Sequence, residues 1–99
     1  MLLDNYKTIG EVIDLPDPTF KSELNGMSIG EIWNLKFMLS QEYHRSIIVQ
    51  GDLTNKMAEL DSDTPEFKEL KDLSMSLYAK MQSIEDKNRI ASEKIELLK

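Results

Sequence analysis

The sequence predicts an all-α protein, a long antiparallel helical hairpin of coiled-coil type preceded by an N-terminal arm with one or two short helices. Three observations lead to this fold class. A heptad pattern runs to the C-terminus, a second helical pattern begins at Ser28, and only the short segment Asp61 to Thr64 separates them. Helices joined by so short a connection lie antiparallel. We expect the arm to span residues 1–27 and the hairpin 28–99, with helices at about 28–61 and 65–98.

The C-terminal helix is predicted by a heptad seam in which eight of ten positions are apolar. Thr64 suits the N-cap and Pro65 the first helical position. Polar Asn88 occupies one a position, where it either fixes register or oligomeric state, or lies hydrated in a frayed end of the seam. The seam positions are Phe67, Leu70, Ser74, Leu77, Met81, Ile84, Asn88, Ala91, Ile95 and Leu98.

The preceding helix is predicted to begin at Ser28, because Ser28 and Glu31 have the spacing of a capping box. Its apolar pattern contains one irregular step around Tyr43, which a coiled coil accommodates as a stutter. Gly51 could end the helix, but matching the roughly 50 Å length of the second helix favours one continuous or merely kinked helix. The predicted seam consists of Ile32, Leu35, Leu39, Tyr43, Ile47, Leu53, Met57 and Leu60.

The arm carries weaker signals than the hairpin. Residues 2–15 have helical spacing, but β-branched residues around Gly10 leave a strand or an extended segment open. Two prolines follow and restrict the chain to an extended path. Asp17 then suits an N-cap and Asn25–Gly26 a C-cap, which predicts one short helix between them.

Composition narrows the functional classes. A formal net charge of -6 over 99 residues argues against general nucleic-acid binding and against an anionic membrane surface. The chain has no cysteine, which excludes disulfides and thiolate metal sites. No apolar run approaches a membrane span, and the N-terminus does not resemble a signal peptide, so we expect a cytoplasmic protein.

A two-helix hairpin cannot enclose a core, because each helix exposes the side that its partner leaves uncovered. We expect the arm to cover part of this surface and a homo-oligomeric helical bundle to bury the rest. Lys80, Lys87 and Lys94 recur at g positions and favour an acidic partner, either helix 28–61 or an external protein. The apolar residues away from the seams are Ile29, Trp33, Phe37, Met38, Ile48, Val49, Leu73, Met75, Tyr78, Ile90 and Leu97.

One group of residues on helix 28–61 combines aromatic, imidazole and cationic side chains. In an oligomer it could stack on a flat ring and pair with phosphate. The alternative is that its aromatic residues belong to the core and its cations to a solvated face. This candidate anionic-ligand cluster consists of Trp33, Lys36, Tyr43, His44 and Arg45.

Catalysis and metal binding find little support in the sequence. His44 is the sole histidine, and no strained turn or glycine-rich loop accompanies it, so we expect no enzyme and no cofactor. The acidic residues at 61–69 lack the ligand spacing and the glycine of a calcium loop, so we expect no metal site.

The leading functional hypothesis is a non-enzymatic, self-associating protein that acts by binding another protein, as adaptors and small inhibitors do. The alternative is an oligomeric sponge that sequesters a small anionic ligand, such as a nucleotide or cyclic nucleotide, in pockets between subunits. That role would suit a bacteriophage protein directed against host nucleotide signalling. A purely structural coiled coil without a ligand is a third hypothesis.

Overall fold

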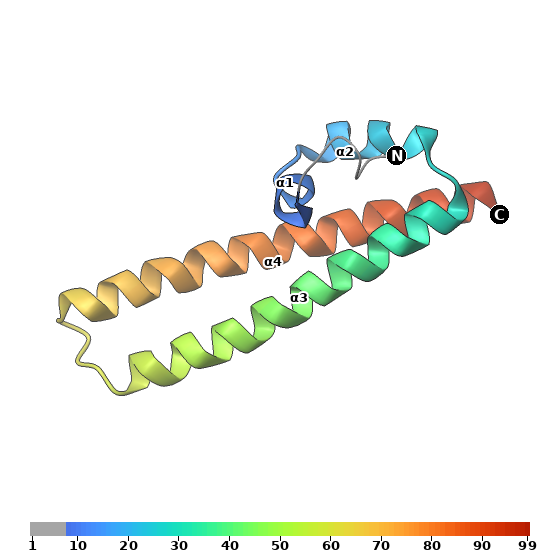
Figure 1. The fold of residues 1–99 in the computed structure, drawn as a ribbon. Coiled ribbons are helices and arrows are strands. Elements are labelled where there is room, and N and C mark those ends of the chain that lie inside the picture. The colour runs from blue at the N-terminus through green and yellow to red at the C-terminus, as the bar shows by residue number, and fades with distance from the viewer. Residues whose placement is uncertain (1–7) are drawn as a thin grey trace.

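The computed structural model describes residues 8–99 and shows a slender all-helical hairpin with a small arm folded against one end (Figure 1). Two long helices, α3 (Ile29–Ala58) and α4 (Pro65–Leu98), run antiparallel. The arm contains α1 (Ile9–Ile13), α2 (Asp17–Glu23) and the 3-10 helix η2 (Leu24–Gly26). No strand occurs in the described part of the chain. The predicted all-α helical hairpin is therefore confirmed.

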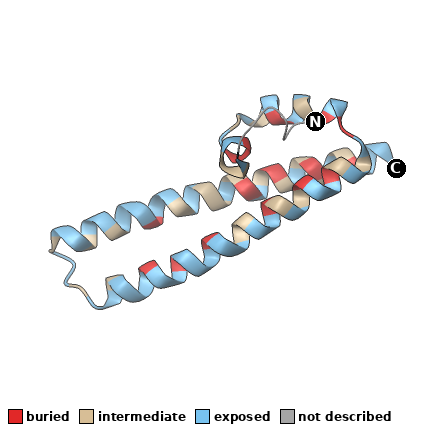
Figure 2. Cartoon of the chain, viewed as in Figure 1, coloured by how far each residue is buried: buried red, intermediate tan, exposed pale blue. Residues whose placement is uncertain are grey.

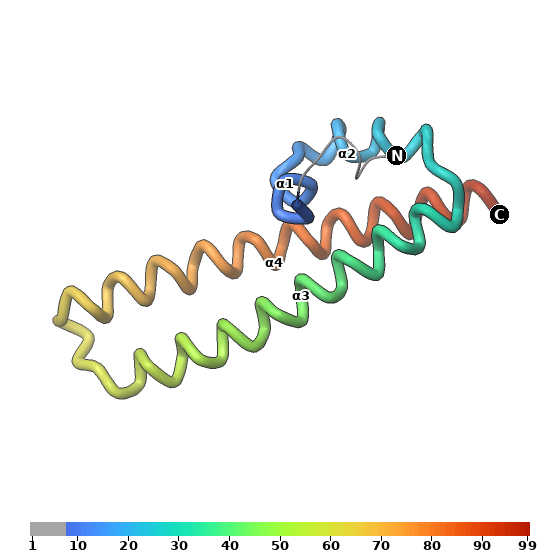
Figure 3. The backbone as a smooth tube through the Cα atoms, in the orientation of Figure 1, coloured from blue at the N-terminus to red at the C-terminus, as the bar shows by residue number. Residues whose placement is uncertain are grey.

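Helix α3 begins with the capping box that the sequence predicts. The hydroxyl of Ser28 accepts from the backbone N–H of Glu31, and the Glu31 carboxylate accepts from the backbone N–H of Ser28, both at 3.2 Å. The helix then runs through Gly51 without a break, as the tube in Figure 3 shows. Sequence and structure thus agree that one continuous helix forms the first half of the hairpin.

Helix α3 ends at Ala58, slightly earlier than predicted. The next two N–H groups, those of Glu59 and Leu60, donate to the carbonyls of Lys56 and Met57, each at 3.2 Å. This spacing of three residues tightens the last turn into 3-10 geometry and closes the helix. The chain therefore leaves α3 before the acidic connection begins.

Helix α4 begins at the predicted cap. The Thr64 hydroxyl accepts from the backbone N–H of Phe67 at 3.3 Å and donates to the carbonyl of Asp61 at 2.8 Å. Pro65 occupies the first helical position, where its missing N–H costs nothing. One side chain thus both closes the connection and starts the second long helix.

The arm is helical over residues 9–13 and 17–26, so the first of these segments forms a helix and not a strand. Thr8 caps α1 by accepting from the backbone N–H of Glu11 at 3.3 Å. The part of the predicted segment 2–15 that precedes Thr8 lies outside the described residues.

Two predictions for the second arm helix are wrong. Asp17 is not an N-cap: Pro16 holds that position without a side-chain bond, and Asp17 is the first residue of α2. The expected C-cap at Asn25–Gly26 is absent too, because the chain tightens into η2 there, and no glycine among the described residues has a positive φ.

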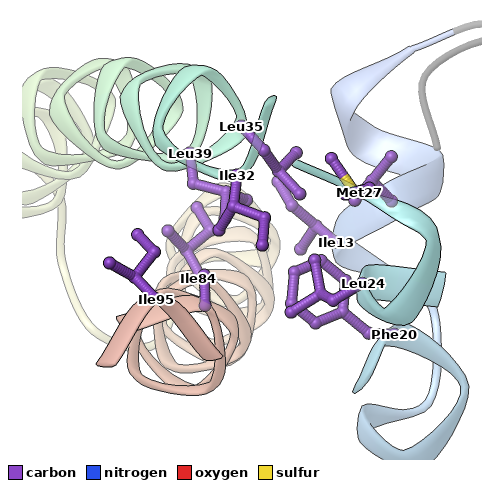
Figure 4. Close-up of a cluster of buried hydrophobic side chains, with 11 residues drawn as sticks. Ile13, Phe20, Leu24, Met27, Ile32, Leu35, Leu39, Ile84 and Ile95 are labelled. Carbon is purple, nitrogen blue, oxygen red and sulfur yellow. The ribbon is translucent and has the colours of Figure 1, made fainter. Parts of the chain in front are cut away.

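The hydrophobic core lies where the arm meets the hairpin. We call this end, the arm with residues 29–43 of α3 and 82–98 of α4, the base half, and residues 44–81 the tip half. Buried residues concentrate in the base half (Figure 2), and arm side chains face those of both long helices there (Figure 4). The core cluster consists of Val12, Ile13, Phe20, Leu24, Met27, Ile32, Leu35, Leu39, Ile84, Ala91 and Ile95.

Candidate interaction surfaces

The heptad seam of α4 faces the rest of the molecule along nearly its whole length. Ser74, Ile84, Ala91 and Ile95 are buried. The half-buried seam positions are Phe67, Leu70, Leu77, Met81 and Asn88. Leu98, predicted to belong to the seam, is instead 41% exposed, because it is the last residue of α4 and lies at the open end of the hairpin.

On α3 the seam follows a different path from the predicted one. Ile47 was expected to face α4 but is 45% exposed, whereas Ser46 and Gln50 are buried. After the irregular step at Tyr43, alternating steps of three and four residues lead through Ser46 and Gln50 to Leu53. The prediction placed Ile47 in the seam because Ile47 is apolar, but the geometry of the helix places the polar residues Ser46 and Gln50 there.

These polar residues form a layer between the long helices in the tip half. The Gln50 side-chain amide donates to the Ser74 hydroxyl. The Ser46 hydroxyl donates to the carbonyl of Glu42 at 2.9 Å. The Gln50 side-chain oxygen is buried and finds no hydrogen-bond partner among the described residues. An unsatisfied buried acceptor costs about 1 to 3 kcal/mol, so this layer holds the two helices together weakly.

The lysines at the g positions of α4 divide between two partners. Lys80 Nζ lies 2.7 Å from Glu42 Oε1 on α3, as the charge pattern predicts. Lys87 and Lys94, however, face the arm, and Lys94 donates to the Asn25 side-chain oxygen at 3.0 Å. The prediction that helix 28–61 receives all three lysines is therefore correct only for Lys80. The arm occupies this side of α4 in the base half.

Among the charged side chains of residues 8–99, that of Lys87 is the most deeply buried. Its side chain is only 2% exposed, and its Nζ lies 3.2 Å from Asp17 Oδ1. The same ammonium lies 5.7 Å from the centre of the Phe20 ring. A buried ammonium is tolerated only where a counter-charge stabilises it, so α2 both covers and neutralises Lys87.

The five residues of the anionic-ligand cluster do not converge on one point. Lys36 Nζ donates to the Ser92 hydroxyl at 2.6 Å and lies 4.8 Å from the centre of the Trp33 ring. Trp33 is exposed, so its alternative assignment to the core is wrong. Arg45 points elsewhere and pairs with Glu42 at 3.5 Å.

Tyr43 and His44 line a shallow depression between the two long helices. The Tyr43 hydroxyl donates to Glu85 Oε1 at 2.7 Å. This hydrogen bond raises the pKa of Tyr43, as do its partial burial and the negative charge of Glu85, because each disfavours the phenolate. The other lining residues are Ser40, Glu85 and Asn88.

A second depression, which we call the tip groove, lies on the side of the hairpin that carries Lys80. Val49 and Leu53 of α3 form one wall. On α4 the tip groove combines two neighbouring hollows that share Leu73 and Ser76. Glu69 and Asp72 line the first hollow, and Leu77 and Lys80 line the second, so acidic residues lie at one end and Lys80 at the other. The sequence identifies Val49 and Leu73 as apolar residues away from the seam, but it does not show that they lie together.

Residues 8–99 contain neither a candidate metal site nor a candidate membrane-spanning helix. No three histidine, aspartate or glutamate side chains lie close enough together to hold a metal ion. None of the helices there is both long and apolar enough to cross a lipid bilayer. Comparison of the chain with protein-family models, curated proteins and solved structures finds no match.

Proposed function

We propose that this protein is non-enzymatic, self-associates and acts by binding another protein, as an adaptor or inhibitor does. The observation that supports this proposal is the apolar surface that the two long helices leave exposed. Apolar side chains that line a depression on a small protein are typical of a binding site, because water is released when a partner covers them. The exposed large apolar residues are Trp33, Phe37, Ile47, Ile48, Val49, Leu73, Met75, Tyr78, Leu97 and Leu98.

Part of this surface forms a strip along the outward face of α3. Phe37 and Ile48 line one depression there together with His44 and Arg45. Helical partners commonly bind such faces through apolar anchors spaced by three or four residues. We assign the outer α3 strip, defined by Phe37, His44 and Ile48, to the protein partner.

The anionic-ligand hypothesis remains the second candidate. Aromatic and cationic groups do lie together where Lys36 covers Trp33. However, Arg45 already pairs with Glu42, and the carboxylate of Glu85 lies beside Tyr43, so the negative charge of a phosphate would be opposed there. This arrangement favours protein binding over a nucleotide sponge. The expected cytoplasmic location remains a prediction.

Co-purification from the native host tests the proposal. A tagged wild-type chain should retain a defined protein partner, and Phe37→Ala with Ile48→Ala should lose it. The matched control is Ser40→Ala with Gln41→Ala, which alters polar residues of the same depression and should keep the partner.

Native mass spectrometry of the same preparations supplies the opposing outcome. The wild-type chain could carry a few hundred daltons of additional mass that Lys36→Ala with Arg45→Ala removes. That result would contradict protein binding and support the sequestration of a small ligand. Wild-type protein that retains neither partner nor ligand would refute both functions.

A further inference from the structure

The tip groove continues a side of α4 that is covered elsewhere in the molecule. Lys87 and Lys94 lie on that side and contact the arm in the base half. Lys80 lies one heptad earlier in the same row and ends the tip groove. The arm does not reach this far, so Val49 and Leu73 remain about half exposed, at 48% and 57%. The hairpin thus has a third layer over its base half and an uncovered apolar surface over its tip half.

The charges of the tip groove follow a definite order along α4. Glu69 and Asp72 lie at one end, Leu73 and Ser76 in the middle, and Lys80 at the other end. Asp72 and Lys80 are each four residues, or about 6 Å along the helix axis, from Ser76. A two-fold rotation about an axis through Ser76 therefore brings the acidic end of one copy opposite the basic end of another. A parallel arrangement would place like charges together.

We propose that the tip groove binds the tip groove of a second copy, antiparallel about a two-fold axis near Ser76. Leu73 and Val49 of each copy are covered by the other, and Asp72 of each faces Lys80 of its partner. The small side chain of Ser76 lets the two α4 helices approach closely at the axis. This inference rests on the self-association part of the proposed function and names its surface. It is independent of the protein partner assigned to α3.

The first test compares two exposed apolar residues on α4. Leu73 and Met75 have similar exposures, 57% and 61%, but only Leu73 lines the tip groove. In analytical ultracentrifugation the wild type should dimerise, Met75→Glu should dimerise equally well, and Leu73→Glu should raise the dissociation constant about tenfold or more. Wild-type protein that stays monomeric would overturn both the self-association and this surface. A dimer that Leu73→Glu leaves intact would overturn only this surface.

The second test uses charge reversal to detect the antiparallel geometry. Asp72→Lys and Lys80→Glu should each weaken the homodimer, because each brings like charges together at both ends. An equimolar mixture of the two variants should restore dimers, because a mixed pair has opposite charges at both contacts. Circular dichroism checks that Lys80→Glu still folds, since Lys80 also pairs with Glu42 within the chain. Two folded variants that stay monomeric when mixed would contradict the antiparallel pairing.

A cysteine at the proposed axis gives a readout that does not depend on these charges. The chain contains no cysteine, so Ser76→Cys introduces a single thiol. Two such thiols facing each other across the axis should form a disulfide under mild oxidation much faster than those of a Met75→Cys control. Equal rates for the two variants would place the axis elsewhere and refute the proposed geometry.

Discussion

The base half and the tip half of the hairpin are built from the same two helices but are held together differently. In the base half, arm residues such as Phe20 and Leu24 complete a core with both long helices. In the tip half, the seam buries Ser46, Gln50 and Ser74 beside Leu53. A pair of helices encloses apolar residues fully only where a third element covers them. The base half obtains that element from its own chain, and we propose that the tip half obtains it from a second copy.

The buried ion pair illustrates the same difference. Lys87 and Lys80 occupy equivalent g positions one heptad apart. Lys87 is buried because α2 covers it and Asp17 neutralises it, whereas Lys80 remains partly exposed. Two residues at the same heptad position can therefore differ in burial, because a different segment packs over each of them. The repeat places Ile84, Ala91 and Ile95 in the core, and the arm adds Lys87, a g position, to the buried residues of α4.

The largest expected loss of stability comes from truncating Phe20, the largest arm side chain in the core. Phe20 is fully buried, and Phe20→Ala should lower the free energy of unfolding by about 3 to 5 kcal/mol, because it loses apolar burial and leaves a cavity. Phe37→Ala, at an exposed site, should change it by less than about 0.5 kcal/mol. Urea denaturation of both variants checks this. Similar losses in the two would show that the arm does not contribute to the core.

A smaller loss should follow from breaking the ion pair of the base half. Asp17→Ala leaves the buried Lys87 ammonium without its counter-charge and should cost about 1 to 2 kcal/mol, at the low end for a buried pair because Asp17 is half-buried. Adding Lys87→Met should recover most of the loss, since no charge then remains buried. Thermal unfolding of the single and double variants measures this coupling. The pairing would be refuted if the second substitution only added to the damage.

In the tip half, by contrast, replacing buried polar residues with apolar ones should make the protein more stable. Gln50→Leu with Ser74→Ala removes the unpartnered Gln50 oxygen from the seam and should raise the free energy of unfolding by about 1 kcal/mol. The control Thr54→Ala removes a neighbouring hydroxyl that bonds only back to the carbonyl of Gln50, and should have little effect. Chemical denaturation distinguishes the two. A destabilised double variant would show that the polar layer supports the tip half.

The smallest expected effect on stability is the pH dependence that arises from Tyr43. Its pKa lies above the ordinary value of 10.0, so the neutral phenol is the form that folding favours. This contribution to stability is fully present below the ordinary pKa and is lost as the pH rises through the raised value. Ultraviolet titration should detect the late ionisation of Tyr43, and Glu85→Gln should move the pKa of Tyr43 downward. An unchanged titration curve in that variant would exclude Glu85 as the cause.

Local signals in the sequence predict much of the fold. The capping box at Ser28 and the cap at Thr64 depend on residues three apart, so both helix starts can be derived without knowledge of the rest of the chain. The path of the α3 seam could not be derived in this way, because Ser46 and Gln50 carry no apolar signal. Their burial follows from the register of the hairpin.

The candidate surfaces were less predictable, because their residues come from distant parts of the chain. The proximity of Lys36 to Trp33 follows from helical spacing alone. The contact of Asp17 with Lys87, by contrast, depends on how the arm folds back along α4. The tip groove likewise forms only when the register brings Val49 beside Leu73. Sequence patterns identified these residues as apolar or charged but not as neighbours.

Amide hydrogen exchange at low and high protein concentration tests the contrast between the two halves most directly. We predict that the core helices of the base half, around Leu35 and Ala91, exchange slowly at every concentration, because the arm protects them within one chain. The tip half, around Leu53 and Leu73, should become protected only as the concentration rises and a second copy covers it. Tip-half protection that is strong and independent of concentration would contradict the account.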